Sequence, residues 1–193
     1  KNLLYTIKTE LADITIIYDE HFGKTLNKVD YTIDCGTEAA AFLSTLQIIE
    51  SKNLPDDTII YILEDDYLHR GYWCNAMLEA FKLPIQYVTL YDHLDKYLDY
   101  PNLRSQIFVT DCSHWRTIPS TTNTFACRMG QLRQDLEVHK KYSIHRDISD
   151  DNAKFLELGS MGRVLISPMP GYSTHCNDYL SPIVKWGFSD GVL

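Results

Sequence analysis

The pattern of apolar and polar positions along the chain predicts an α/β fold. Short apolar runs predict β-strands at 14–18, 31–33, 58–63, 85–90, 106–110 and 163–166. Helices are expected at 37–51, 73–81, 129–142 and 152–158, the first with apolar side chains three and four positions apart and Thr37 as its N-cap. Strands and helices that alternate in this order are typical of βαβ units. We therefore expect one domain over residues 1–193, built on a mixed, mostly parallel sheet flanked by helices.

The stretch from Thr58 to Trp73, TIIYILEDDYLHRGYW, joins the strongest strand pattern to three adjacent acids, Glu64, Asp65 and Asp66. Ligands of open α/β sheets bind in the crevice outside the carboxyl ends of strands, where these acids would lie. Adjacent carboxylates repel one another, and a divalent cation such as Mn²⁺ or Mg²⁺ would neutralise them and could also hold a diphosphate. The alternative is an acidic turn that caps the next helix.

Other polar groups follow predicted strands or open a helix, and each has a structural alternative. His175 could join Asp66 on a metal ion, or be an ordinary surface residue. Asp150 or Asp151 could accept a proton from an attacking hydroxyl group, or simply cap a helix. His114 and Trp115 could form a platform for a sugar ring, or Trp115 could pack inside the protein.

Three basic residues, Arg70, Arg116 and Lys154, are candidates to contact a diphosphate, and the alternative for each is a solvated charge.

The composition limits the classes of partner. The net charge of −8 without a basic stripe argues against nucleic acid. No apolar run approaches the length of a membrane span, and no signal peptide opens the chain. Five scattered cysteines without a C-x-x-C pair predict reduced thiols in a cytoplasmic compartment.

In its acidic motif, the sequence resembles the GT-A (Rossmann-like) glycosyltransferases, in which a D-x-D triplet holds a metal ion and the diphosphate of a nucleotide sugar. The wider set of segments resembles the small glycosyltransferase domain of chlorella viruses and related viral and bacterial proteins; they are GTEAAAFL, LEDDYLHRGYW, YVTLYDH, SHWRTIPSTTNTF, SDDNAKFLEL and LISPMPGYSTHCNDYLSPIVKW. The resemblance covers roughly Ile14 to Trp186. If the protein is viral, it would act in the host cytoplasm.

The resemblance implies roles for particular residues. Asp66 is the main metal ligand, assisted by Asp65 and His175, and Asp151 or its neighbour Asp150 is the catalytic base. The remaining roles fall into two groups, with Glu64, Asp65, Gly36 and Arg70 at the nucleotide sugar and His114, Trp115 and Thr122 at the substrate. Glu64 departs from a strict D-x-D motif. The strand that binds the nucleotide base in this fold would be Leu3–Ile7, or absent.

The expected activity is transfer of a hexosyl or deoxyhexosyl group from a nucleoside diphosphate sugar, such as a UDP-sugar, to a hydroxyl group of a glycan or glycoprotein. The cofactor would be Mn²⁺ or Mg²⁺. Two alternatives remain open: a Mg²⁺-dependent phosphohydrolase that uses the same carboxylates, and a non-catalytic module that binds a nucleotide or glycan.

Overall fold

The computed structural model describes residues 12–23, 29–100 and 102–175, and its helices and strands form one α/β domain. The strands are β1 (Ile17–Asp19), β2 (Tyr31–Ile33), β3 (Ile59–Ile62), β4 (Tyr67–His69), β5 (Tyr87–Val88), β6 (Ile107–Val109), β7 (His114–Thr117), β8 (Phe125–Arg128), β9 (Leu165–Met169) and β10 (Ser173–His175). The helices are η1 (Glu20–Phe22), α2 (Glu38–Ser51), α3 (Trp73–Ala80), α4 (Asp95–Leu98), α5 (Met129–Lys141) and α6 (Asp151–Ser160).

The predicted helices are confirmed to within a few residues, and Thr37 caps α2 by accepting a hydrogen bond from the backbone N–H of Ala40. The strand predicted at 14–18 lies slightly later, at β1. The short helix α4 was not among the predicted helices. The predicted strand Leu3–Ile7 lies outside the described residues.

The main sheet has six strands in the order β3-β8-β5-β9-β7-β6. Only the pair β5–β9 is parallel, and the other four neighbouring pairs are antiparallel. The expectation of a mostly parallel sheet is therefore wrong for the described residues, although the sheet is mixed and flanked by helices. The error has a local cause, because β7 (HWRT) and β8 (FACR) are short strands that run against their neighbours and lack a β-branched apolar run.

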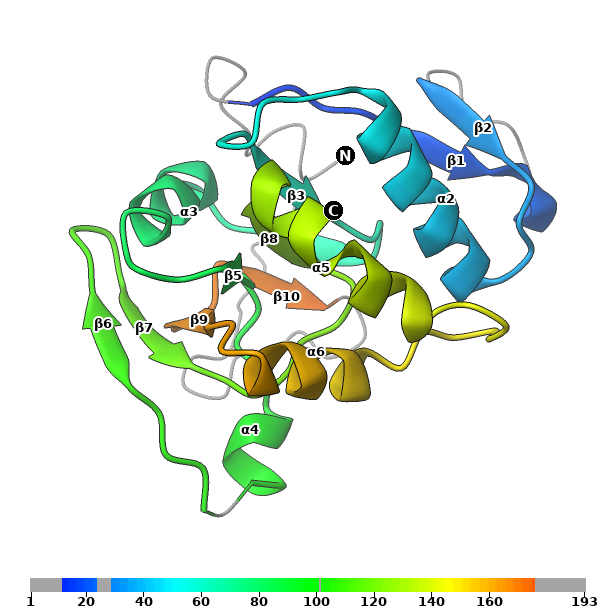
Figure 1. Cartoon of the computed structure of the whole chain (residues 1–193). Helices are drawn as coiled ribbons and strands as arrows, with labels where there is room; N and C mark the ends of the chain where they lie inside the picture. The colour runs from blue at the N-terminus through cyan, green and yellow to red at the C-terminus, as the bar shows by residue number, and fades with distance from the viewer. Residues whose placement is uncertain (1–11, 24–28, 101, 176–193) are drawn as a thin grey trace, which may run out of the picture.

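These pairings fix the direction of each strand. Because β8 runs antiparallel to both β3 and β5, and β5 is parallel to β9, the strands β3, β5 and β9 point the same way. Their carboxyl ends therefore share one edge of the sheet. The antiparallel strand β8 begins at that same edge, so the segment that precedes β8 also lies there. Figure 1 shows the order of these strands across the domain.

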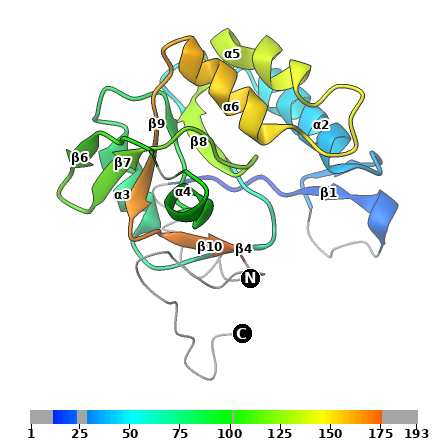
Figure 2. The same cartoon turned by 90° about the horizontal axis from the view of Figure 1, so that it is seen from below.

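Both faces at the centre of the sheet are covered by apolar side chains, whereas Ile107 and Val109 of the end strand β6 are exposed. Side chains alternate between faces, so Tyr87, Phe125 and Leu165 lie in one apolar cluster with α2, α5 and α6. Val88, Ala126 and Ile166 face a second cluster that contains α3. Figure 2 shows α2, α5 and α6 on one side of the sheet and a ribbon formed by β4 and β10 on the opposite side.

No helix among residues 12–23, 29–100 and 102–175 combines the length and the apolar character needed to cross a membrane.

Candidate functional site

The acids Glu64, Asp65 and Asp66 follow β3 at the shared edge of the sheet, and they lead directly into β4. Asp65 and Asp66 form a turn between two strands, so they do not cap a helix as the structural alternative proposed. Asp65 is exposed at this turn, whereas Glu64 and Asp66 are partly buried. The three carboxyl groups therefore differ in their surroundings although they are adjacent in the sequence.

Glu64 is the central member of what we call the acidic cluster, the carboxyl groups of Glu38, Glu64, Asp66 and Asp151. The pKa of Glu64 is raised to about 7, first by burial and then by the charges of the other three members. The Thr124 hydroxyl donates a hydrogen bond of 3.0 Å to Glu64 Oε2 and opposes this rise in pKa. A carboxyl group with a pKa near neutrality can exchange a proton at physiological pH.

Asp66 contacts His175, which lies 109 positions later in the chain. The antiparallel pairing of β4 with β10 places His175 opposite Tyr67, next to the acidic turn, and His175 Nε2 lies 2.7 Å from Asp66 Oδ2. The second carboxylate oxygen, Asp66 Oδ1, is buried and has no hydrogen-bond partner among the described residues. The pairing of Asp66 with His175 expected from the sequence is present as a direct contact.

The donor set at Asp66 can be compared with what Mn²⁺ or Mg²⁺ needs. Within the described parts of the chain, no group of three or more His, Cys, Asp or Glu side chains is arranged to hold a metal ion. These ions keep several waters and often bind one or two protein ligands together with substrate phosphates. A carboxylate with a free oxygen beside an imidazole fits such a site, in which a diphosphate would supply the remaining ligands.

Asp150 and Asp151 open α6, and their roles separate in the structure. The Asp150 side chain accepts a hydrogen bond of 3.1 Å from the backbone N–H of Ala153, so Asp150 is the N-cap. Asp150 therefore has the capping role that the sequence offered as the alternative to a catalytic role. The Asp151 carboxylate instead accepts a 2.7 Å bond from the ammonium group of Lys154. Burial raises the pKa of Asp151, and the charge of Lys154 opposes the rise.

Lys154 is fully buried, which the sequence did not predict. Its ammonium group contacts Asp151 and the amide oxygen of Asn123, and it lies 4.6 Å from the centre of the Phe42 ring. Burial lowers the pKa of Lys154, while Asp151, Glu38 and Glu64 raise it. The hypothesis that Lys154 reaches a diphosphate is wrong, since this internal cation instead balances part of the charge of the acidic cluster.

Glu38 brings the start of α2 to the same place. Its carboxylate accepts hydrogen bonds from the Asn123 amide and from the backbone N–H of Ser149, the latter at 2.7 Å. Gly36 precedes this helix with a φ of +73°, and an added Cβ would lie 3.1 Å from the His21 ring, so the turn requires glycine. Its N–H donates to Asp19 at 3.3 Å. A role for Gly36 at the nucleotide stays a prediction.

The segment from Ser120 to Thr124, STTNT, holds these elements together. Each of its side chains bonds to a different partner: Lys96, His93, Tyr67, Glu38 together with Lys154, and Glu64, in that order. Four of the five residues are buried. A polar segment packed in this way fixes the positions of acids that come from three separate parts of the chain.

An open cleft of about 480 Å³ borders the acidic cluster. Its lining includes Asp151 and Asn152 of α6, Ser120, Thr121 and Thr122 of the STTNT segment, and His93 and Tyr100. Thr122, predicted to contact the substrate, is therefore at a cleft. The volume lies within the range of small-molecule sites, about 300 to 1,000 Å³.

Two further sequence hypotheses are corrected by burial. Trp115 is completely buried in the apolar core, so it cannot form a sugar platform, and the packing alternative is the right one. His114 is exposed at the start of β7, beside Met169 of β9. Arg116 is buried and pairs with Asp92 at 3.0 Å, so it is neither solvated nor available to a diphosphate.

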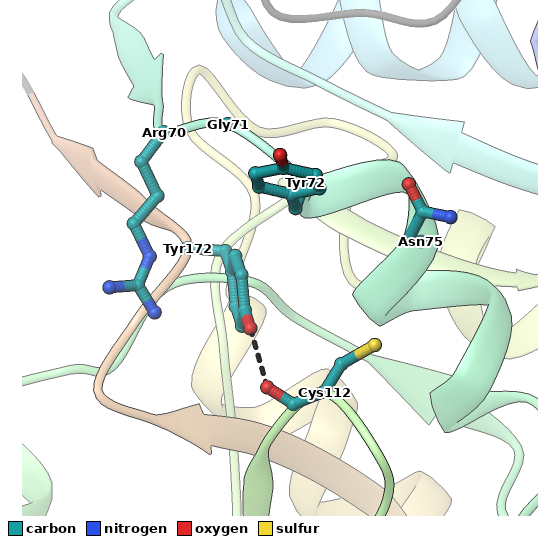
Figure 3. Close-up of a pocket in the computed structure, with 6 residues that line it drawn as sticks. All are labelled: Arg70, Gly71, Tyr72, Asn75, Cys112 and Tyr172. Carbon is teal, nitrogen blue, oxygen red and sulfur yellow. Dashed lines mark hydrogen bonds between the residues drawn. The ribbon is translucent and has the colours of Figure 1, made fainter.

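Arg70 lies outside the acidic cluster, in a second pocket at the far end of β4 (Figure 3). Its guanidinium group lies 4.2 Å from the centre of the Tyr172 ring and donates a 3.3 Å hydrogen bond to the backbone oxygen of Pro170. The structure thus brings together Glu64, Asp66, Asp151 and His175, and separates Arg70 from the Asp66–His175 contact by the length of β4.

Sequence reasoning missed Glu38, Asn123 and Thr124, and it gave Lys154 a different role. Glu38 and Lys154 follow N-caps closely and resemble ordinary first-turn helix residues, so the sequence contains no sign of their burial. The STTNT segment did contain a sign, since five consecutive polar residues without Gly or Pro are unusual for a solvent-exposed turn.

Comparison with known proteins adds no assignment: no protein-family model matches the sequence, and no curated protein matches it.

Proposed function

We propose that this protein is a GT-A-type glycosyltransferase that moves a sugar from a nucleoside diphosphate sugar, such as a UDP-sugar, to a hydroxyl group of a glycan acceptor. The observation that carries the proposal is the contact between Asp66 and His175 at the sheet edge where Glu64 and Asp151 also gather. Glycosyl transfer from a diphosphate needs a place for the leaving group and a group that removes a proton, and these residues are suited to both.

Asp151 is our candidate for the base in an inverting reaction. The acceptor oxygen would bond to the anomeric carbon while the bond from that carbon to the diphosphate breaks, and the acceptor proton would pass to the Asp151 carboxylate. Burial raises the pKa of Asp151, which makes the carboxylate a stronger base, and the bond from Lys154 fixes its orientation. A retaining reaction would instead need a nucleophile, or the donor phosphate, on the face of the leaving group.

Asp66 and His175 would hold the metal ion, with the free Oδ1 of Asp66 as a ligand position. When bound, Mn²⁺ or Mg²⁺ would neutralise the charge that develops on the departing diphosphate. Glu64 lies one residue from this turn, and in its protonated form it could donate a hydrogen bond to the donor sugar or ribose.

A product assay tests this proposal against its alternatives. The protein is incubated with UDP-sugars and GDP-sugars plus Mn²⁺, with and without a mixture of oligosaccharide acceptors, and nucleoside diphosphate, free sugar and phosphate are measured separately. The proposal predicts release of the nucleoside diphosphate that increases when an acceptor is present. Release of inorganic phosphate without an acceptor would indicate a phosphohydrolase, and binding of nucleotide without any turnover would indicate a non-catalytic module.

A further inference from the structure

A second pocket lies at the end of β4 opposite the acidic turn, and it has a different chemical character. Its cavity volume is about 660 Å³, and it is lined by Arg70, Gly71, Tyr72, Asn75, Cys112 and Tyr172. Figure 3 shows the two tyrosine rings and Asn75 around this space, with the Cys112 side chain below them. No acidic side chain is among the described residues that line it.

Arg70 supplies a cation without a carboxylate partner in the described parts of the chain. It donates to the backbone oxygen of Pro170 and stacks on Tyr172, but its Nε is buried and has no hydrogen-bond partner there. Arg116 and Arg163, by contrast, each pair with a buried aspartate. In a protein with a net charge of −8, a partly buried guanidinium group with no carboxylate partner among the described residues favours an anionic ligand.

Asn75 and the two tyrosines indicate which other chemical groups the ligand should carry. The side-chain oxygen of Asn75 is buried and unbonded among the described residues, so it needs a donor such as a hydroxyl group. Tyr72 is 72% exposed at the start of α3, and Tyr172 is held by a 2.8 Å hydrogen bond to the backbone oxygen of Cys112. The exposed Tyr72 ring offers a flat apolar surface of the kind that packs against the C–H face of a sugar, whereas the buried Tyr172 ring supports the Arg70 guanidinium group.

We propose that this pocket binds a sugar ring that carries an anionic group, with the anion at Arg70, a hydroxyl group at Asn75 and the ring against Tyr72. Asp66 and Arg70 lie at opposite ends of β4, four residue steps apart, which is about 13 Å in an extended strand. An oligosaccharide could bridge that distance, so the pocket would hold an acidic residue of the acceptor glycan. This acceptor role rests on the proposed function, whereas the binding itself does not.

The exposed thiol of Cys112 gives a direct test, because it lines the pocket. The rate at which iodoacetamide modifies Cys112 is measured by peptide mass spectrometry, in EDTA and without nucleotide. Three probes are compared: methyl glucuronide, methyl glucoside 6-sulfate and neutral methyl glucoside. We expect at least one anionic probe to protect Cys112 at a concentration about tenfold or more below that of the neutral glucoside.

Variants show whether the protection depends on Arg70. Arg70→Gln should remove the preference for the anionic probe, while Arg104→Gln, the same change at an exposed arginine outside the pocket, should keep it. Protection by glucuronide but not by the sulfate would identify a carboxylate as the preferred anion, and the reverse would identify a sulfate or phosphate ester.

Equal protection by charged and neutral sugars would overturn the proposal, as would no protection by either anionic probe, unchanged selectivity in Arg70→Gln, or stronger protection by UMP than by the sugars. Asp66→Ala should leave the protection intact. The protection experiment measures sugar binding and the product assay measures sugar transfer. Failure of the pocket proposal and failure of the proposed function can therefore be distinguished.

Discussion

Two groups of buried charges lie in this domain, and they differ in how completely their carboxylates are bonded. We call Tyr87, Gln131, Asp135, His139 and Arg163 the Asp135 network. Asp135 is fully buried and accepts hydrogen bonds from the Tyr87 hydroxyl, the Gln131 amide and the Arg163 guanidinium, at 2.6 to 3.2 Å. The acidic cluster also contains buried carboxylates, but its bonds are incomplete.

The carboxyl groups of the acidic cluster, whose hydrogen bonding is incomplete, gather at the shared edge of the sheet. Asp66 has one buried oxygen without a partner among the described residues, Asp151 lines a cleft, and Glu64 has a pKa raised to about 7. A saturated carboxylate such as Asp135 has no lone pair left for a ligand, so its role is to hold α5 to the strands beneath it. The comparison teaches that unsatisfied capacity, rather than burial alone, distinguishes a candidate site from a structural ion pair.

The largest effect should follow from removing the proposed base. Asp151→Asn is expected to lower the turnover number by about 100-fold or more while changing the donor affinity little, because the amide cannot accept the acceptor proton. Steady-state kinetics with a UDP-sugar would measure both constants. Asp150→Asn is the matched control, since asparagine also caps helices well, and turnover should stay near that of the wild type. Equal loss in both variants would remove Asp151 as the base.

Asp66→Ala should weaken metal-dependent donor binding by more than about 100-fold, since a bound metal contributes several kcal/mol. Its free energy of unfolding should change by less than about 1 kcal/mol, because the side chain is 44% exposed and its ion pair is only partly buried. Asp57→Ala makes the same change at an exposed residue at the other end of β3. Unchanged donor affinity in Asp66→Ala would contradict the metal assignment.

The Asp135 network should respond in the opposite way. Asp135→Asn should lower the free energy of unfolding by about 2 to 3 kcal/mol, a moderate value for a buried ion pair because Arg163 is partly exposed and can regain water. Urea denaturation would measure the loss. Donor affinity below the unfolding range should not change. A variant that folds normally but binds donor poorly would abolish the distinction between the two regions.

The smallest expected effect is a pH dependence that originates at Glu64. Its ordinary pKa is 4.5 and its folded pKa is about 7, so between these values the folded state holds more protons than the unfolded state. Its contribution to stability is therefore complete below pH 4.5 and is lost as the pH rises through 7. The size of the shift corresponds to about 3 kcal/mol, which screening by water at this partly buried residue reduces to about 2 kcal/mol. Glu64→Gln should flatten this part of the curve of stability against pH.

Glu137→Gln, a change at an 87% exposed carboxylate, should leave that curve unaltered. If Glu64→Gln and wild type lose stability in parallel between pH 4.5 and 7, the proton is held elsewhere in the acidic cluster.

The helices and the central strands could be predicted because their sequence patterns are local. Thr37 followed by spaced apolar residues marks α2, and the run IIYI marks β3. The strands β7 and β8 could not be found in this way, because each contains only one large apolar residue, Trp115 or Phe125, and pairing with distant strands makes them extended.

The candidate site was predictable only in part, for the same reason. The EDD motif and His175 stand out as residue types suited to metals, and the contact between Asp66 and His175 agrees with that prediction. Burial cannot be deduced from a single position, so the sequence left open whether Trp115 is a sugar platform or part of the core, and it offered Lys154 only a diphosphate or solvent. Tertiary packing decides both cases, because it makes Trp115 part of the core and Lys154 an internal counter-ion.

The most direct test of the acidic cluster as the functional site is a calorimetric titration of UDP and GDP in the presence of Mn²⁺, repeated after addition of EDTA. The account predicts that one nucleotide binds with Mn²⁺, and that binding disappears in EDTA and in Asp66→Ala but persists in Asp135→Asn. Nucleotide binding that is indifferent to EDTA and to Asp66, or no binding of either nucleotide by the folded protein, would contradict it.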